Sequence, residues 1–497
     1  MRKQHYLILF TCFLLSWSLL AAQTEILTPR GGVEEEENVI TQIGNPLLEL
    51  AVAAIKEGNY QAAIVQLNAV LQLDNKNARA FAERGWAKYQ LKDYNFAISD
   101  LSRAIELDND NIEFYNRRGM TYYMLNEFTK ALLDFDKMLE LDALFPKAYY
   151  MRGQCYAGLK DNKKALEAYN RAIQLLPNYP MAYNNRGVTK SLLNDTEGAI
   201  EDYNRGILLD SNQTVLYQNR GRLRQQQFQY NFAVEDFSAA IRLSPAEGEL
   251  YYRRGMVRRE LGDYASAVKD FNQAIGLSKD ERADFYFQRG LTYYYWRKQN
   301  EALPDLNKAL TINEKLGEAY YFKALIFDLN METETALAYL NRCLEYSPDY
   351  EAAYTVRGRI YYQQDKYVLA IKDFTQVIKT LPEDEGAYYS RANAYRKAGR
   401  YREAIDDYTQ VVRFNSSHEQ AYHGRAICKF ETGEFKASLT DFDKCIELNP
   451  SLKEAYFNRA SSKVALTDKA GACADFKKSA LLGMAKAESP AILKLCE

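Results

Sequence analysis

Hydrophobic residues recur along most of the chain at intervals of three and four, which is the spacing of one face of an α-helix. From residue 44 onward, apolar-periodic stretches of about fourteen residues follow one another in pairs. A short turn joins the two members of a pair and often contains Gly or Asn-Asp, as in Gly262-Asp263-Tyr264. The pattern predicts a succession of helical hairpins.

The hairpins repeat with a period of 34 residues. The stretches 148–153, 250–255 and 353–358 (AYYMRG, LYYRRG and AYTVRG) occupy the same place in three of the repeats. Repeats are predicted to start at 44, 78, 112, 146, 180, 214, 248, 283, 317, 351, 385, 419 and 453, with one step of 35 near Arg282. Seven of the eleven prolines lie at junctions between repeats, where a helix has to end.

Four positions of the repeat carry a constant type of side chain. Position 4 is Tyr in eleven repeats, position 8 is Gly or Ala, position 20 is Ala except for Ser438, and position 24 is Phe, Tyr or Leu. This signature resembles that of the tetratricopeptide repeat family. The resemblance implies an all-α fold, a right-handed α-solenoid (superhelix) of about 13 helix-turn-helix repeats at 44–485, closed by a C-terminal capping helix at 486–497. It also explains most of the 39 tyrosines as packing residues.

A second regularity joins position 7, usually Arg, to position 23, usually Asp. Because the spacing of sixteen residues is constant and a guanidinium fits a carboxylate, we favour ion pairs between the two helices over a basic ladder for ligands. Repeat 4 keeps Arg152 but has Ala168, and repeat 9 has Lys323 and Tyr339. The ten predicted pairs are Arg84/Asp100, Arg118/Asp134, Arg186/Asp202, Arg220/Asp236, Arg254/Asp270, Arg289/Asp305, Arg357/Asp373, Arg391/Asp407, Arg425/Asp441 and Arg459/Asp475.

The first 22 residues have the three parts of a secretory signal peptide. Arg2 and Lys3 are followed by an apolar run and then by the small residues Ala21 and Ala22. The apolar run, 6–20, is shorter than the roughly 20 residues of a membrane-spanning helix, so we expect cleavage after Ala22 rather than anchoring. The acidic segment 23–43 is predicted to be a flexible linker, and the mature chain is expected in the periplasm or outside the cell, without membrane insertion.

Six cysteines follow the predicted signal peptide, too widely spaced for a disulfide framework. The end of the chain, from Gly471 through Cys473 to Cys496, resembles the closing unit of exported tetratricopeptide proteins of Bacteroidota-like bacteria. That resemblance and the predicted export suggest a disulfide between Cys473 and Cys496, with free thiols as the alternative. The other four, Cys155, Cys343, Cys428 and Cys445, are expected to be small core residues.

The sequence offers little for catalysis, for a cofactor or for a metal. The formal net charge of −2 and the predicted export argue against a nucleic-acid partner. His418 and His423 have no cluster of ligands at metal-binding spacing, and no nucleophile or phosphate-loop motif is present. We therefore expect no enzyme, no cofactor and no metal site.

In the resembled family, positions 2, 5, 6, 9, 12 and 13 of the first helices line a concave groove that binds peptides or partner helices. Tyr and Arg favour binding hot spots, and at these positions they predict a protein or peptide ligand. Asn185, Asn219 and Asn458 match one position of a carboxylate-binding mode whose lysines are missing here. The predicted groove residues are Arg222, Tyr252, Arg253, Arg259, Tyr294, Tyr321, Arg359, Tyr362, Tyr389 and Arg396.

Two alternatives stay open for the function. The chain could be a structural or regulatory subunit that docks by its convex face or its ends onto an envelope complex. It could also bind glycans or the cell wall, because tyrosine-rich grooves can stack on sugars. The sequence does not define the oligomeric state.

Overall fold

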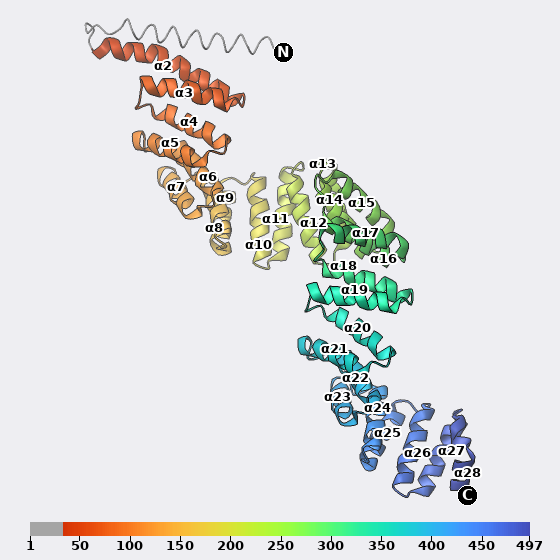
Figure 1. Cartoon of the computed structure of the whole chain (residues 1–497). Coiled ribbons are helices and arrows are strands. Elements are labelled where there is room, and N and C mark those ends of the chain that lie inside the picture. Colours follow the sequence, from red (N-terminus) through yellow and green to blue (C-terminus); the bar gives the residue numbers. More distant parts are fainter. Residues whose placement is uncertain (1–32) are drawn as a thin grey trace. The chain divides into compact units, whose positions relative to one another are not determined.

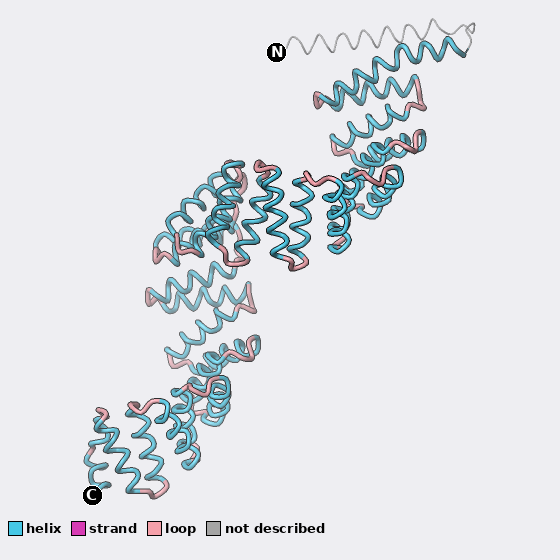
Figure 2. The backbone as a smooth tube through the Cα atoms, turned by 180° about the vertical axis from the view of Figure 1, so that it is seen from behind, coloured by secondary structure: helices cyan, strands magenta, loops and turns pink. Residues whose placement is uncertain are grey.

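The computed structural model describes residues 33–497, and their side chains from residue 44. The predicted signal peptide, 1–22, lies outside the described residues, as does the start of the predicted linker. The chain divides into two compact units, Met1–Leu243 and Ser244–Glu497. Both consist of helices joined by short turns, and no strand occurs within residues 33–497 (Figures 1 and 2).

The helices α2 to α27 form thirteen consecutive pairs. In the first unit they are α2 (Val33–Lys56), α3 (Tyr60–Leu73), α4 (Ala78–Gln90), α5 (Tyr94–Leu107), α6 (Ile112–Met124), α7 (Phe128–Leu141), α8 (Pro146–Gly158), α9 (Asn162–Leu175), α10 (Pro180–Leu192), α11 (Thr196–Leu209), α12 (Thr214–Gln226) and α13 (Tyr230–Leu243).

In the second unit they are α14 (Gly248–Glu260), α15 (Tyr264–Leu277), α16 (Ala283–Tyr295), α17 (Gln299–Ile312), α18 (Gly317–Leu329), α19 (Thr333–Tyr346), α20 (Glu351–Gln363), α21 (Tyr367–Thr380), α22 (Glu385–Lys397), α23 (Tyr401–Phe414), α24 (Glu419–Glu431), α25 (Phe435–Leu448), α26 (Lys453–Ala465) and α27 (Lys469–Leu481). A 3₁₀ turn, η1 (Ala485–Glu488), and α28 (Pro490–Cys496) follow.

The predicted repeat starts are confirmed from the second repeat onward, because each coincides with the first residue of a first helix. The prediction of a linker up to residue 43 is wrong for residues 33–43, which belong to α2. Apolar residues at Val33, Val39 and Ile40 and the helix-forming glutamates between them favour this extension. Pro46 lies inside α2 and removes one backbone donor there.

Each hairpin turns through one residue in the left-handed conformation, directly after the last turn of the first helix. This residue is Gly58, Gly262, Gly399 or Gly433 in four repeats. In the other nine it carries a side chain, among them Phe228 and Met331, whose φ angles are 60° and 63°. The close of the helix is thus set by backbone hydrogen bonds, such as Phe228 N–H to the Gln225 carbonyl, and glycine is favoured but not required.

The core of each repeat is a close contact between its two helices. Position 20 is fully buried in all thirteen repeats, for example Ala267 and Ala370. A Cβ atom added to Gly153 would lie 2.5 Å from the Tyr169 ring, and one added to Gly119 would lie 2.7 Å from the Phe135 ring. The small side chains therefore let the aromatic ring of the second helix reach the backbone of the first, as the repeat signature predicts.

All ten predicted Arg–Asp pairs are formed. In each, Nη2 of the arginine lies 2.5–2.7 Å from Oδ1 of the aspartate, and Nε donates a second hydrogen bond to the same carboxylate. The aspartate side chains are only 2–8% exposed. Burial raises the pKa of Asp134 and Asp407 even though their arginine partners lower it, so desolvation offsets much of the attraction.

The same arginines also join neighbouring repeats. In at least nine of them Nη1 donates a hydrogen bond to a polar side chain at position 25 of the preceding repeat. These pairs are Arg84–Asn68, Arg118–Ser102, Arg186–Asn170, Arg220–Asn204, Arg289–Asn272, Arg357–Asn341, Arg391–Thr375, Arg425–Thr409 and Arg459–Asp443. One guanidinium therefore connects three helices from two repeats.

The two exceptional repeats replace the ion pair in different ways. In repeat 4, which lacks the aspartate, Arg152 Nε lies 3.0 Å from Asp136 Oδ1, at position 25 of the preceding repeat. In repeat 9, Lys323 Nζ lies 4.0 Å from the centre of the Tyr339 ring. A cation–π contact thus stands where the other repeats have a guanidinium and a carboxylate.

A disulfide closes the C-terminal end. Cys473 on α27 is bonded to Cys496 at the end of α28, with their Cα atoms 5.6 Å apart. The cap was predicted to be one helix, but it consists of η1 and α28. The two are separate because Ser489 is extended before Pro490. The four remaining cysteines are buried, and burial raises the pKa of each thiol to about 12.

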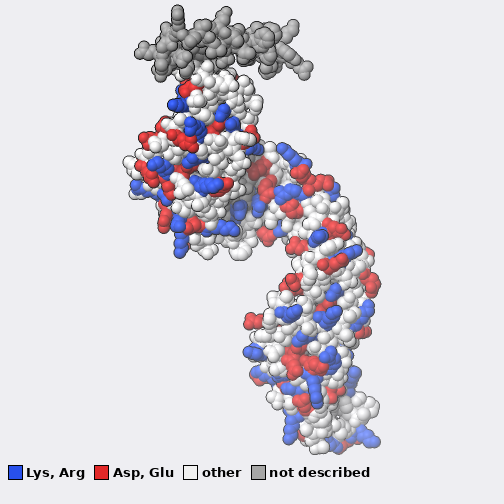
Figure 3. Space-filling view, turned by 60° about the vertical axis from the view of Figure 1, so that its left-hand side comes forward, with Lys and Arg blue, Asp and Glu red and all other residues white. Residues whose placement is uncertain are grey.

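First helices of consecutive repeats pack closer together than second helices do, for example α14 with α16, α20 with α22, and α4 with α6. Within each unit the first helices consequently line the inner, concave side. Acidic and basic residues are interspersed over the face seen in Figure 3. Among residues 33–497 no helix has the length and hydropathy needed to cross a membrane.

Removing one member of a buried ion pair should lower the free energy of unfolding by more than the intact pair contributes to it. We expect Asp134→Ala to lower the stability of repeat 3 by about 3–5 kcal/mol, because Arg118 is left buried without its carboxylate. Hydrogen exchange of the amides of α6 and α7 during mild urea denaturation would measure this loss. The double variant Arg118→Met/Asp134→Leu should recover most of it.

The matched control lies on the same helix. Glu140 pairs with Lys137 at the surface and its side chain is 68% exposed, so Glu140→Ala should change stability by about 0.5 kcal/mol or less. We call the ten Arg–Asp pairs the Arg–Asp ladder. Equal losses of stability for Asp134→Ala and Glu140→Ala would contradict its structural role.

Candidate functional site

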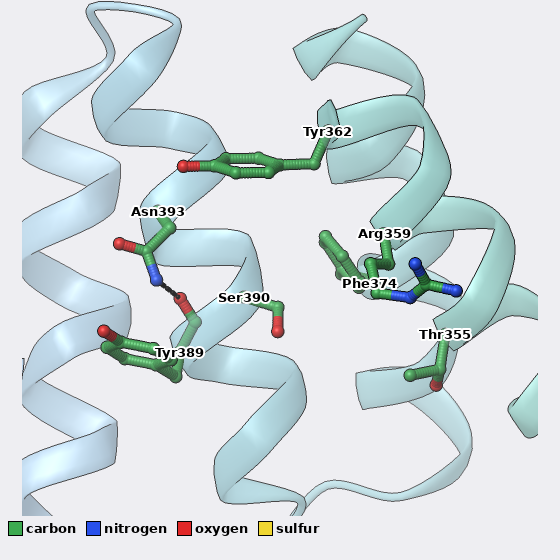
Figure 4. Close-up of a pocket in the computed structure, with 7 residues that line it drawn as sticks. All are labelled: Thr355, Arg359, Tyr362, Phe374, Tyr389, Ser390 and Asn393. Carbon is green, nitrogen blue, oxygen red and sulfur yellow. Dashed lines mark hydrogen bonds between the residues drawn. The ribbon is translucent and has the colours of Figure 1, made fainter. Parts of the chain in front are cut away.

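A pocket of about 210 Å³ opens between α20 and α22, the first helices of repeats 10 and 11. It is lined by Thr355, Arg359, Tyr362, Phe374, Tyr389, Ser390 and Asn393. Six of these seven residues lie at the predicted groove positions 5, 6, 9 and 12. Figure 4 shows the Tyr362 ring reaching from α20 towards α22, with Ser390 between the two helices.

Three consecutive residues of α21 hold the two walls of the pocket together. Asp373 accepts two hydrogen bonds from Arg357 of α20. Phe374 forms the floor, and its approach to α20 requires Gly358, where an added Cβ would lie 2.9 Å from the ring. Thr375 Oγ1 accepts a hydrogen bond of 3.1 Å from Arg391 of α22. The Arg–Asp ladder therefore fixes the width of the pocket.

A chain of hydrogen bonds orients the polar side of the pocket. Arg396 Nε donates to the Tyr408 hydroxyl at 3.3 Å, and that hydroxyl donates to Asn393 Oδ1 at 2.8 Å. Asn393 Nδ2 in turn donates to the Tyr389 carbonyl, the contact drawn in Figure 4. Tyr408 is fully buried, so the amide of Asn393 and the guanidinium of Arg396 are held in fixed orientations.

Three predicted groove residues, Arg359, Tyr362 and Tyr389, come together in this pocket. The Arg359 guanidinium points away from Ser390 and lies 2.5 Å from Asp328 of α18. The Tyr389 ring packs on His418, with ring centres 4.7 Å apart. The pocket interior is consequently lined by the Tyr362 and Phe374 rings and the aliphatic part of Arg359, with Ser390 and Asn393 as polar groups.

Tyr252 was predicted to lie on the groove surface, and this prediction is wrong. Only 8% of it is exposed, and its ring stacks on Phe285 of the next repeat at 4.7 Å and meets Phe271 edge-on. Arg282 covers this aromatic group, with its guanidinium 3.9 Å from the Phe285 ring. Tyr252 is therefore a core residue between repeats 7 and 8.

Two further predicted arginines are engaged in ion pairs. Arg253 Nε lies 2.7 Å from Glu249, which also accepts from Arg282. Arg259 is only 11% exposed and is hydrogen-bonded to Gln288 and Glu260. Arg259 thereby joins α14 to α16, whereas the ion pair of Arg253 with Glu249 lies within α14.

Tyr294 and Tyr321 belong to an aromatic cluster of repeats 8 and 9. Both rings meet Phe322, with centres 5.3 Å apart, and Tyr321 also meets Tyr350. Arg222, the one predicted groove residue of the first unit, is exposed. It lines a smaller depression of about 160 Å³ between α10 and α12, together with Ser191, Asn219 and Gln226.

The three asparagines at position 6 serve contacts between repeats. Asn185 donates to the Tyr150 hydroxyl, Asn219 donates to Asn184, and Asn458 is hydrogen-bonded to His423. In each case the partner is position 5 of the preceding repeat. Burial and the nearby Arg396 lower the pKa of His423, which keeps its ring uncharged at neutral pH.

Thr355, Ser390 and Asn393 occupy groove positions but were not predicted as site residues, because only Tyr and Arg were taken as hot-spot side chains. Phe374 was assigned to the core at position 24, and it is both core residue and pocket floor. Among the described residues, no group of three or more His, Cys, Asp or Glu is arranged to hold a metal ion.

Helical hairpins stacked through constant small–aromatic contacts, with a groove along their first helices, define an α-solenoid repeat protein. Models of the tetratricopeptide repeat match residues 146–179, 182–213, 248–281, 283–316, 317–350, 386–418 and 419–452, and a TPR repeat model matches residues 85–126. Together these matches cover more than half of the chain. The chain belongs to the tetratricopeptide repeat family.

Solved structures that are similar to the chain match it over different lengths. A tetratricopeptide repeat protein from Parabacteroides merdae is 19% identical, covers 50% of this chain and 99% of its own, and has a TM-score of 0.42. YrrB is 24% identical, with 38% and 96% covered and a TM-score of 0.34. The Cut9–Hcn1 structure is 13% identical, with 91% and 95% covered and a TM-score of 0.37. No curated protein matches the chain.

The burial of Tyr252 gives a direct test of its corrected role. Tyr252→Ala should destabilise repeats 7 and 8 by about 3–5 kcal/mol, as expected for removing a buried aromatic ring. Tyr295→Ala, which removes a ring that is 48% exposed, should cost about 1 kcal/mol or less. Thermal unfolding followed by circular dichroism compares the two; a larger loss for Tyr295→Ala would reverse the assignment.

Proposed function

We propose that this protein is a non-enzymatic scaffold or adaptor that binds a protein or peptide in the groove of its first helices. The pocket between α20 and α22 carries the proposal. It is built from groove positions of two consecutive repeats, and the ladder holds its walls at a fixed distance. A preorganised pocket binds a ligand without the free-energy cost of ordering the site.

The volume of the pocket favours one side chain of a larger ligand. About 210 Å³ exceeds the roughly 150 Å³ of an apolar cavity that accepts benzene. It is smaller than the roughly 300–1,000 Å³ typical of pockets that enclose a complete small molecule. An apolar or aromatic side chain can enter, while the rest of the ligand lies along α20 and α22.

We further propose that the protein acts outside the cytoplasm. The signal-peptide pattern of residues 1–22 supports this location, and so does the Cys473–Cys496 disulfide, because such bonds persist mainly in oxidising compartments. The chain isolated from its own cells should begin at Gln23, and Cys473 should resist alkylation until it is reduced. N-terminal sequencing and intact-mass measurement test both points. A chain beginning at Met1 with a reactive Cys473 would contradict the export.

The binding site can be tested by filling the pocket. Ser390 is half-buried between the two helices, so Ser390→Trp should occupy the space that a ligand side chain would enter. Peptides selected from a random display library against the full chain should lose at least tenfold in affinity, or about 1.4 kcal/mol. Fluorescence anisotropy of the labelled peptides measures the change.

Ser390→Ala is the matched control, since it keeps the pocket open and should bind the same peptides normally. Ser191→Trp provides a second control, because Ser191 lines the smaller depression beside Arg222 in the first unit. If the selected peptides bind Ser390→Trp as well as the unaltered chain, the pocket is not the site. Docking by the convex face or the ends would then be favoured.

A further inference from the structure

The groove changes its sign of charge between repeats 9 and 10. In repeats 8 and 9, the charged residues at the six groove positions are Asp284, Glu318 and Asp328, all acidic. In repeats 10 and 11 they are Arg359, Arg396 and Lys397, all basic. The pocket between α20 and α22 lies on the basic side of this change.

The cations on the basic side differ in how far they are neutralised. Arg359 is paired with Asp328. Arg396 has the Tyr408 hydroxyl as its hydrogen-bond partner, and Lys397 is exposed at the end of α22. Within residues 33–497, no carboxylate forms an ion pair with Arg396 or Lys397. Two positive charges therefore remain to be balanced at this end of α22.

The spare cations lie close to the pocket along the same helix. Arg396 follows Asn393 by three residues, a rise of roughly 4.5 Å, and the Tyr408 hydroxyl joins the two side chains. An extended peptide advances roughly 3.3 Å per residue. A residue one or two places from the one in the pocket would consequently reach Arg396 and Lys397.

We propose that repeats 10 and 11 bind an extended peptide segment in which an aromatic side chain is followed or preceded, one or two residues away, by an acidic side chain. The ring enters the pocket against Tyr362 and Phe374, and the carboxylate pairs with Arg396 and Lys397. The Arg396 guanidinium, already oriented by Tyr408, suits a carboxylate in both shape and charge. This assignment rests on the proposed function of the pocket and adds the chemistry of its ligand.

The test uses four labelled nine-residue peptides with the full chain. Their central pairs are Phe-Glu, Phe-Gln, Ala-Glu and Phe-Lys in an otherwise constant Gly-Ser background. Fluorescence anisotropy at low salt should rank Phe-Glu tightest, with Ala-Glu and Phe-Lys each at least tenfold weaker. Raising the salt from 50 to 300 mM should weaken Phe-Glu more than Phe-Gln, because only the former pairs with the cations.

Variants separate the two parts of the site. Lys397→Gln and Arg396→Gln should each reduce the preference for Phe-Glu over Phe-Gln at least threefold, while the preference for Phe over Ala is kept. Arg396→Lys retains the charge and should recover part of the preference. Lys372→Gln is the matched control, because Lys372 is exposed on the second helix α21 and should leave all four affinities unchanged.

The possible failures are distinguishable. Equal binding of Phe-Glu, Phe-Gln and Phe-Lys, still abolished by Ser390→Trp, would overturn the acidic preference and leave the peptide-binding pocket in place. Binding that depends on Glu but not on Phe would also overturn the proposed segment. If none of the peptides responds to Ser390→Trp, while peptides from the random library also fail to do so, the proposed function itself is refuted.

Discussion

A bidentate bond between an arginine of the first helix and an aspartate of the second holds each typical repeat together. The two side chains lie sixteen residues apart in sequence, and the carboxylate is nearly excluded from water. Planar pairing restricts the angle between the two groups as well as their distance. The remaining Nη1 atom of the same guanidinium reaches the preceding repeat. Hairpin geometry and stacking are thus coupled through one side chain, and the small–aromatic contacts fill the space around it.

The fold was predictable because every repeat packs its two helices through the same small and large side chains at the same positions. Fixed spacing revealed the Arg–Asp pairs, and their loss in repeat 9 together with the gain of Tyr339 was visible in the sequence. That Lys323 would place its charge on that ring required the structure. The links to the preceding repeat had a signal that was missed, since position 25 carries Asn, Ser, Asp or Thr in the first twelve repeats. The extension of α2 and the division of the cap at Pro490 had no counterpart in the repeat pattern.

Individual groove residues were harder to predict because register alone does not determine exposure. Tyr252 and Tyr389 occupy the same position of their repeats, yet their surroundings differ. Phe285 of the next repeat stacks on Tyr252 and buries it. Tyr389 instead meets His418, and the adjacent pocket remains open. The deciding residues lie about thirty positions away in sequence, at the junction between repeats, where the family signature leaves the side chain undefined.

The division of labour between positions explains how a groove can vary while the solenoid stays the same. Positions 7 and 8 of the first helix and positions 20, 23, 24 and 25 of the second helix carry the contacts within and between repeats. The charged residues at positions 2, 5, 6, 9, 12 and 13 change from acidic in repeats 8 and 9 to basic in repeats 10 and 11, while the Arg–Asp pair is kept in repeats 8, 10 and 11. The two sets meet on α21, where Phe374 between Asp373 and Thr375 is both pocket floor and structural link. The residues that stabilise the repeats therefore determine the shape of the pocket. The residues at the groove positions around it can vary and determine which ligand it binds.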